Sequence, residues 1–194
     1  MRRLAELAHD EAAAAPYIMP MHPALGLLLF VGTILGMEAV AYAAHRWVMH
    51  GPGWFLHRSH HSHRPGRFEA NDLYAAIFAL PSIALLYMGV QGGWGDWAAW
   101  MGAGIAGYGA IYFGFHDVIV HKRVGHRYLP KSRYMKRIVQ AHRLHHVVET
   151  REGNVSFGFL WAPAPERLKA ELARRGKAGV RAPRTGDASA SSSV

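Results

Sequence analysis

The sequence predicts an all-α fold: a polytopic bundle of membrane-spanning helices, with a cytoplasmic cap of histidine-rich helices that holds a dimetal site. Two observations lead to this prediction. Three long, nearly uncharged stretches interrupt the 194-residue chain, and ten of its 14 histidines fall into two copies of one spaced pattern. A third observation, the gathering of Lys and Arg beside one end of the stretches, predicts the orientation of the bundle.

The apolar stretches are long enough to cross a bilayer as helices. Residues 24–44 carry a single charge, that of Glu38, and residues 73–90 and 97–115 carry none. About 20 apolar residues in an α-helix cross the roughly 30 Å of hydrocarbon. Any one stretch alone is also compatible with a core helix of a soluble protein, but three would give a chain of this length too much core. We therefore expect three spans.

The charges beside the stretches orient them. The first stretch begins too late and is too long for a cleaved signal peptide, so we expect it to stay in the mature protein. The connection at residues 91–96 has no Lys or Arg, whereas residues 116–151 contain nine basic and two acidic residues. The positive-inside rule therefore places the histidines in the cytoplasm and the connection outside. We expect anionic lipid headgroups to be the partner of the net charge of +9, because no nucleic-acid-binding motif accompanies the basic residues.

The histidines repeat as an H-x4-H pair followed by an H-x2-H-H block. The ten residues are His45, His50, His57, His60 and His61 in the first copy, and His116, His121, His142, His145 and His146 in the second. Neutral imidazole suits iron, zinc, copper or nickel, and residues three and four apart share a helix face. Five ligands in each of two copies indicate two metals. Histidines that simply decorate a wet, basic surface would explain a lone His22, but not this repetition.

The spacing of the H-x4-H pair raises a geometric question. Residues five apart in an α-helix point about 140° apart, so His45 and His50 share a metal only if the helix ends between them or the site wraps around it. Gly51 and Pro52 follow at once and favour a helix end.

Two polar residues near the histidines are candidates for indirect roles. Glu38 lies seven residues before His45, on the same helix face, inside a span. We favour a hydrogen bond from an imidazole N–H to its carboxylate over an ion pair with an arginine. Asn71, beside Asp72 at the mouth of the second span, is either a helix cap or an outer ligand through water, and the cap is preferred.

The rest of the chain is organised simply. Residues 132–149 have helical periodicity, with histidines on one side and basic residues mostly on the other, which predicts a helix at the membrane interface. One domain covers residues 21–165, between a mobile leader at residues 1–20 and a basic, largely disordered tail at residues 166–194. The absence of cysteine excludes disulfides, iron–sulfur ligation and thiolate-ligated haem.

Several segments carry a family resemblance. GMEAVAYAAHRWVMHG, FEANDLYA, HDVIVHKR, and QAHRLHH followed by EGNVSFGFLWAP resemble the bacterial β-carotene 3-hydroxylases of the fatty acid hydroxylase and membrane desaturase superfamily, over residues 30–165. The resemblance implies a di-iron centre on the ten histidines, O2 as cosubstrate and reduced ferredoxin as electron donor. It also implies location in the bacterial inner membrane, and conversion of β-carotene through β-cryptoxanthin to zeaxanthin by hydroxylation at C3. Such proteins are usually drawn with four spans, which leaves a fourth open here, and His63 and His126 fall outside the shared boxes.

The chemistry of the residues agrees with this implication. Oxidation of an unstrained C–H bond requires a redox-active metal, which zinc is not, so a pair of histidine-bound irons fits. A lipid substrate would enter sideways through a slot framed by small residues of the third span: Ala98, Gly102, Ala106 and Ala110. Four aromatic residues near the metal end are candidates to pack its ring, although the tyrosines also suit anchoring at the interface: Tyr42, Tyr112, Phe113 and Phe115.

Two other functions stay open. With the same chemistry, the substrate would be a fatty acyl chain, a sterol or another carotenoid, acted on by a hydroxylase, ketolase or desaturase. In a different class, the chain would be a membrane haem protein or a metal carrier without catalysis. Haem proteins place single histidines face to face inside the membrane, and the interiors of the predicted spans hold none. A carrier needs a polar path through the bilayer, for which only Glu38 is available.

Overall fold

The computed structural model describes residues 20–62, 68–176 and 180, and its regular elements are helical. Only one isolated bridge, between Val148 and Val180, accompanies the helices in these residues. The elements are α2 (Pro23–Ala43), η1 (Ala44–Met49), α3 (Trp54–His61), η2 (Ala70–Asp72), α4 (Leu73–Val90), α5 (Asp96–Tyr112), η3 (Phe113–Val120), α6 (Arg133–His145) and α7 (Pro165–Arg175). The predicted all-α class is confirmed.

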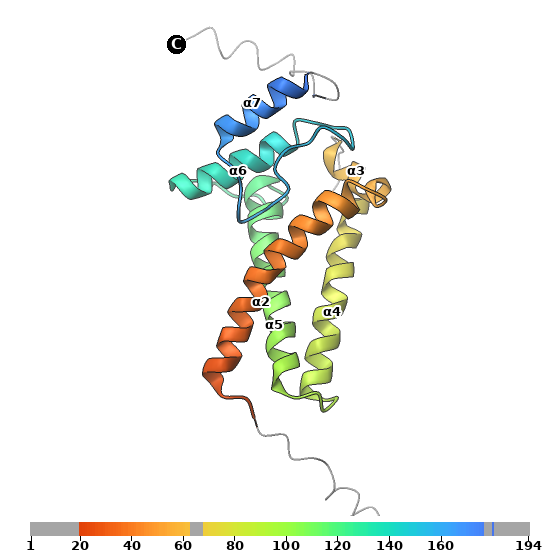
Figure 1. Ribbon diagram of the computed structural model, residues 1–194, viewed down its shortest axis with the longest axis vertical. Helices are drawn as coiled ribbons and strands as arrows, with labels where there is room; N and C mark the ends of the chain where they lie inside the picture. The colour runs from red at the N-terminus through yellow and green to blue at the C-terminus, as the bar shows by residue number, and fades with distance from the viewer. Residues whose placement is uncertain (1–19, 63–67, 177–179, 181–194) are drawn as a thin grey trace, which may run out of the picture.

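Three helical segments of the described residues are long and apolar enough to cross a membrane. They are Pro23–Met49, Ala70–Val90 and Asp96–Val120. Figure 1 shows α2, α4 and α5 as an elongated bundle, with α6 and α7 lying across one end. Large apolar side chains on the outside of this bundle, such as Leu28 and Leu80, are exposed and would face lipid. The three predicted spans are confirmed, and the described residues offer no fourth.

Small residues allow α5 to pack closely against both neighbours. A Cβ on Gly102 would lie 2.8 Å from the Leu86 backbone nitrogen of α4, and one on Gly104 would lie 2.6 Å from Thr33 Cβ of α2. The Ser82 hydroxyl also donates to the Gly102 carbonyl at 2.7 Å. Of the small residues singled out in the sequence, Ala98 and Gly102 are buried, whereas Ala106 and Ala110 are exposed.

The first and third spans end in π-helices, η1 and η3. Each contains the first histidine of an H-x4-H pair, and the second histidine follows as the C-cap. The His50 N–H donates to the His45 carbonyl at 3.0 Å, and the His121 N–H donates to the His116 carbonyl at 2.9 Å. This i to i+5 bond defines the π-helix, in which residues five apart lie one turn apart on the same face. The expected helix end between His45 and His50 is confirmed, since η1 ends at Met49. In addition, its wider π-type turn brings the two imidazoles to the same side.

The cap consists of α6 and α7. The Ser132 side chain accepts a hydrogen bond from the Met135 N–H and starts α6, whose Ile138 and Val139 are buried. Leu168 of α7 belongs to the same hydrophobic cluster. The basic tail expected from residue 166 therefore begins with an ordered helix, because burial of this apolar face stabilises α7. The predicted leader and the rest of the tail lie almost entirely outside the described residues.

Candidate metal centre

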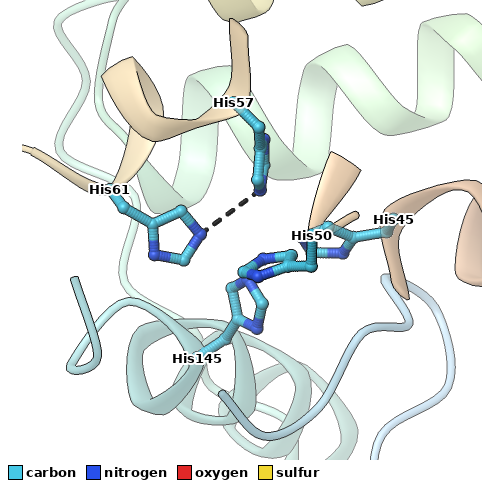
Figure 2. Close-up of side chains that lie close together, drawn as sticks. All are labelled: His45, His50, His57, His61 and His145. Carbon is cyan, nitrogen blue, oxygen red and sulfur yellow. Dashed lines mark hydrogen bonds between the residues drawn. The ribbon is translucent and has the colours of Figure 1, made fainter. Parts of the chain in front are cut away.

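The ten patterned histidines gather into two groups at the cap end of the bundle. Within each group, one ligand atom from every residue lies within 4.8 Å of all the others. Figure 2 shows the first group, with imidazoles from η1 and its C-cap His50, from α3 and from α6 facing a common centre. The His45 group comprises His45, His50, His57, His61 and His145, and the His60 group comprises His60, His116, His121, His142 and His146.

Each group takes four histidines from one sequence copy and one from the other. On α3, His57 and His61 belong to the His45 group, whereas His60 belongs to the His60 group. On α6, His142 and His146 stay together, and His145 crosses to the His45 group. Residues four apart share a helix face, while neighbouring residues point about 100° apart. Each H-x2-H-H block therefore aims two of its histidines at one group and the third at the other, so that each block bridges the two groups.

The spacing between the inward nitrogens fits a metal ion. The Nε2 atoms of His60 and His116 are 2.8 Å apart, and those of His50 and His145 are 3.2 Å apart. Two ligands at right angles around an ion with bonds of about 2.1 Å would be about 3.0 Å apart. The buried Nε2 of His45 has no hydrogen-bond partner in the described part of the chain. The donor set and its geometry thus fit a pair of ions, each in an all-imidazole site.

Burial keeps these imidazoles neutral, as metal ligands must be. Burial lowers the pKa of His50 to about 4, and burial lowers the pKa of both His57 and His121 to about 3. The pKa values of His142 and His145 also lie well below the ordinary value, chiefly because of burial. At neutral pH each ring therefore offers a free lone pair to a metal.

The loop between α6 and α7 fixes the rings of the His45 group. Its backbone carbonyls accept from Nδ1 of four histidines: Val148 from His61 (2.8 Å), Arg151 from His50 (2.9 Å), Val155 from His145 (3.0 Å) and Phe157 from His45 (2.8 Å). A proton held on Nδ1 leaves the Nε2 lone pair free to point inward. The sequence reasoning did not find this role, because backbone carbonyls have no signature of their own.

Asn71 completes this arrangement, since its Oδ1 lies 2.7 Å from Nδ1 of His57. Asn71 is not the helix cap that the sequence favours, because its neighbours Glu69 and Asp72 cap the helix instead. Glu69 and Asp72 make reciprocal bonds between side chain and backbone at the start of η2.

Carboxylates take the corresponding positions beside the His60 group. Oε2 of Glu69 lies 3.1 Å from Nδ1 of His60, and Oδ2 of Asp117 lies 3.3 Å from Nδ1 of His116. The Arg123 guanidinium lies 2.8 Å from Glu69 and 3.1 Å from Asp117. It also lies 2.7 Å from Asp72. Burial raises the pKa of the Glu69 carboxyl, and Arg123 opposes that shift. Sequence reasoning missed Glu69, Asp117 and Arg123, although each lies within nine positions of a ligand.

Glu38 performs neither of the roles expected for it. Its Oε1 accepts from the backbone N–H groups of Phe159, Leu160 and Trp161 at 2.9, 2.9 and 3.1 Å, and its Oε2 accepts from Tyr108 at 2.8 Å. In the described structure it bonds to no imidazole or guanidinium. The loop after α6 lies over this face of α2. The Phe157 carbonyl therefore accepts the hydrogen bond from Nδ1 of His45, and the Glu38 carboxylate accepts those from the backbone N–H groups that follow.

An apolar cavity of about 430 Å³ opens between the spans and ends at the metal centre. It extends from His116 and Asn71 to Leu86 and Ile105. The hydroxyls of its lining residues Tyr74, Ser82 and Tyr108 all donate to protein oxygens, which leaves the walls mainly apolar away from the metal end.

The four aromatic residues suggested for substrate packing divide into two pairs. Tyr112 and Phe113 line the cavity. Tyr42 is absent from its lining and lies edge-on to Phe157, while Phe115 is buried in the hydrophobic core. The cavity therefore supports substrate packing by Tyr112 and Phe113, whereas Tyr42 and Phe115 lie on other faces of their helices.

Two other histidines lie outside both groups. Nε2 of His126 donates to the Val118 carbonyl at 2.7 Å, and His22 accepts from the Ala24 N–H at the start of α2. His63 lies outside the described residues.

Most of this chain is similar in sequence to known proteins. The family model described as fatty acid hydroxylase matches residues 30–163. A β-carotene hydroxylase of Pantoea ananas is 51% identical over 149 residues, which cover 77% of this chain and 83% of the relative. A β-carotene hydroxylase of Paracoccus sp. strain PC1 is 47% identical over 150 residues, covering 77% and 91%. A chloroplastic β-carotene 3-hydroxylase of Arabidopsis thaliana is 36% identical over 156 residues, covering 76% and 51%. No solved structure matches the chain.

Proposed function

We propose that this chain, which belongs to the fatty acid hydroxylase family, is a membrane di-iron monooxygenase that hydroxylates C3 of the β-ionone rings of β-carotene. β-Cryptoxanthin and then zeaxanthin are the products. The observation that carries the proposal is an apolar cavity between the spans that reaches His116, a member of one of two adjoining groups of five histidines. The names of the relatives support the carotenoid.

The ten histidines would hold two iron ions. When bound, the pair supplies the oxidising power to insert one atom of O2 into the C–H bond, while two electrons and two protons convert the other atom to water. The protein contributes the geometry. The loop carbonyls and Asn71 orient the His45 group, and Glu69 and Asp117 orient His60 and His116. Burial of the ligand rings keeps bulk water from the centre.

The cavity would select the substrate and the carbon that reacts. C4 of a β-ionone ring is allylic and C3 is not, so oxidation at C3 requires that the protein hold C3 nearest the metals. Tyr112 and Phe113 line the cavity near His116 and would pack the ring there. Ala79 and Ala106, farther along, leave room for the polyene.

Filling the cavity tests this role. Ala79→Phe should abolish zeaxanthin formation in bacterial cells that accumulate β-carotene, with iron content retained. Ala84→Phe is the matched control, because Ala84 lies on the same helix, is exposed and is absent from the cavity lining. Pigments are separated by chromatography. Unchanged zeaxanthin from Ala79→Phe would refute the cavity as the substrate site. A keto-carotenoid, or activity only on fatty acyl chains or sterols, would favour the alternative lipid oxidations.

A non-catalytic haem or metal-carrying role is less well supported. All ten ligand candidates gather at one end of the bundle, and among the described residues no histidine pair faces across the spans at mid-depth. If the wild-type protein binds iron but cells that express it leave β-carotene unchanged, a non-catalytic role would be favoured.

We further propose that the centre faces the cytoplasm of the bacterial inner membrane and receives electrons from reduced ferredoxin. Exposed basic residues on α6, among them Lys136, Arg137 and Arg143, support a cytoplasmic side next to anionic headgroups. A reporter active only in the cytoplasm should give signal when fused at Lys131 and none at Gly93. Signal at Gly93 would refute the orientation.

A further inference from the structure

The oxygens that accept from the ligand imidazoles differ between the two groups. In the His45 group, each of the five Nδ1 atoms lies 2.7–3.0 Å from an uncharged oxygen, four of them backbone carbonyls and one the Asn71 amide. In the His60 group, two Nδ1 atoms lie against carboxylates, those of Glu69 and Asp117. The two groups are alike in their ligands and unlike in what surrounds them.

The carboxylates beside the His60 group form one ionic cluster. Arg123 contacts Glu69, Asp72 and Asp117, with N···O distances of 2.7–3.1 Å. One guanidinium balances only one of three carboxylates, so the cluster carries a net negative charge. Asp72 and Asp117 also line the end of the cavity, and the side chains are only partly exposed, which limits screening by water.

A carboxylate that accepts from Nδ1–H makes the imidazole a more basic and more strongly donating ligand than a carbonyl does. Loss of such an outer partner typically costs about 10- to 100-fold in metal affinity. The negative cluster adds a direct attraction for a cation in the His60 group. Both effects act in the same direction.

We propose that the two metal positions are inequivalent, with the His60 group binding its ion more tightly than the His45 group because of Glu69, Asp117 and the Arg123 cluster. This inference rests on the di-iron part of the proposed function. Glu69 is a positioning residue in this scheme, since it acts through His60. Asn71 is its uncharged counterpart on His57.

Titration of the metal-free, full-length protein in detergent with ferrous iron, without oxygen, tests the inference. Equilibrium dialysis should show two binding steps, and Mössbauer spectra of half-loaded ⁵⁷Fe samples should show one iron species before a second appears. Glu69→Gln should weaken the first step about 10- to 100-fold and leave the second unchanged. Asn71→Asp, which places a carboxylate beside His57, should tighten the second step.

The control is Glu152→Gln, which removes an exposed carboxylate paired with Arg151 and should change neither step. Elution from a sizing column and thermal unfolding show whether each variant folds. If Glu69→Gln fails to fold, Asn71→Asp still tests the inference. Two irons bound with equal affinity, or equal weakening of both steps by Glu69→Gln, would overturn the inference and leave the di-iron function standing. Binding of fewer than two irons would overturn both.

Discussion

The carboxylate of Glu38 fastens the loop between α6 and α7 to the first span, and Glu38→Gln measures that bond. The loop carries Phe157, whose carbonyl accepts from His45 only two residues before the first N–H bound by Glu38. Glutamine keeps the size and one carbonyl oxygen, so the three N–H bonds remain possible. The negative charge is lost, and the amide NH2 then faces the Tyr108 hydroxyl.

The magnitude follows from the four hydrogen bonds. Bonds to a charged acceptor contribute about 1.5–3 kcal/mol and neutral bonds about 0.5–1.5 kcal/mol, so loss of charge costs about 1 kcal/mol per bond. The bonds share one carboxylate and are partly open to solvent, and such contributions do not add fully. We expect a loss of about 2 kcal/mol, which corresponds to a Tm lower by about 4–8 °C.

The assay is thermal unfolding of the purified protein in detergent, together with zeaxanthin formed per bound iron. Stability should fall while turnover per iron stays unchanged, because Glu38 contacts no ligand histidine directly. Glu171→Gln is the control, since this carboxylate lies on α7 and pairs with exposed Arg174 and Arg175. An unchanged Tm with lower turnover per iron would refute the anchoring role and would mean that Glu38 acts on the metal centre.

Three further predictions follow from the same geometry. His145→Ala should abolish hydroxylation and reduce bound iron, whereas His126→Ala, outside both groups, should retain both; full activity of His145→Ala would contradict the ligand assignment. Ser156 has a φ of 59°, in the left-handed region, so Ser156→Gly should raise stability by about 0.5–1 kcal/mol in thermal unfolding, and a loss would show that its hydroxyl matters more. The metal-free protein should lose stability as pH falls from 6.5 to about 4, because unfolded histidines take up protons in that window while His50, with its pKa near 4, and His57 stay neutral. Thermal unfolding of that form between pH 4 and 8 checks the slope, and a flat profile would contradict the burial of neutral imidazoles.

Much of this protein was predictable from its sequence because the signals are local. The length and apolarity of three stretches predict the spans, since a helix in lipid must be apolar over its whole length. The repeated spacing identifies all ten histidines of the two groups, and those four apart, His57 with His61 and His142 with His146, share a group because they share a helix face.

The tertiary structure alone decided how those histidines are shared and supported. His145 joins the His45 group, and His60 the other, only because α3 and α6 approach each other, which no single-helix periodicity reports. The partner of His45 is a carbonyl 112 residues away, and every residue has a carbonyl, so no residue type marks it. Glu38 was recognisable as a costly charge inside a span, but its partners are backbone N–H groups 121–123 residues along the chain, which only folding brings within reach.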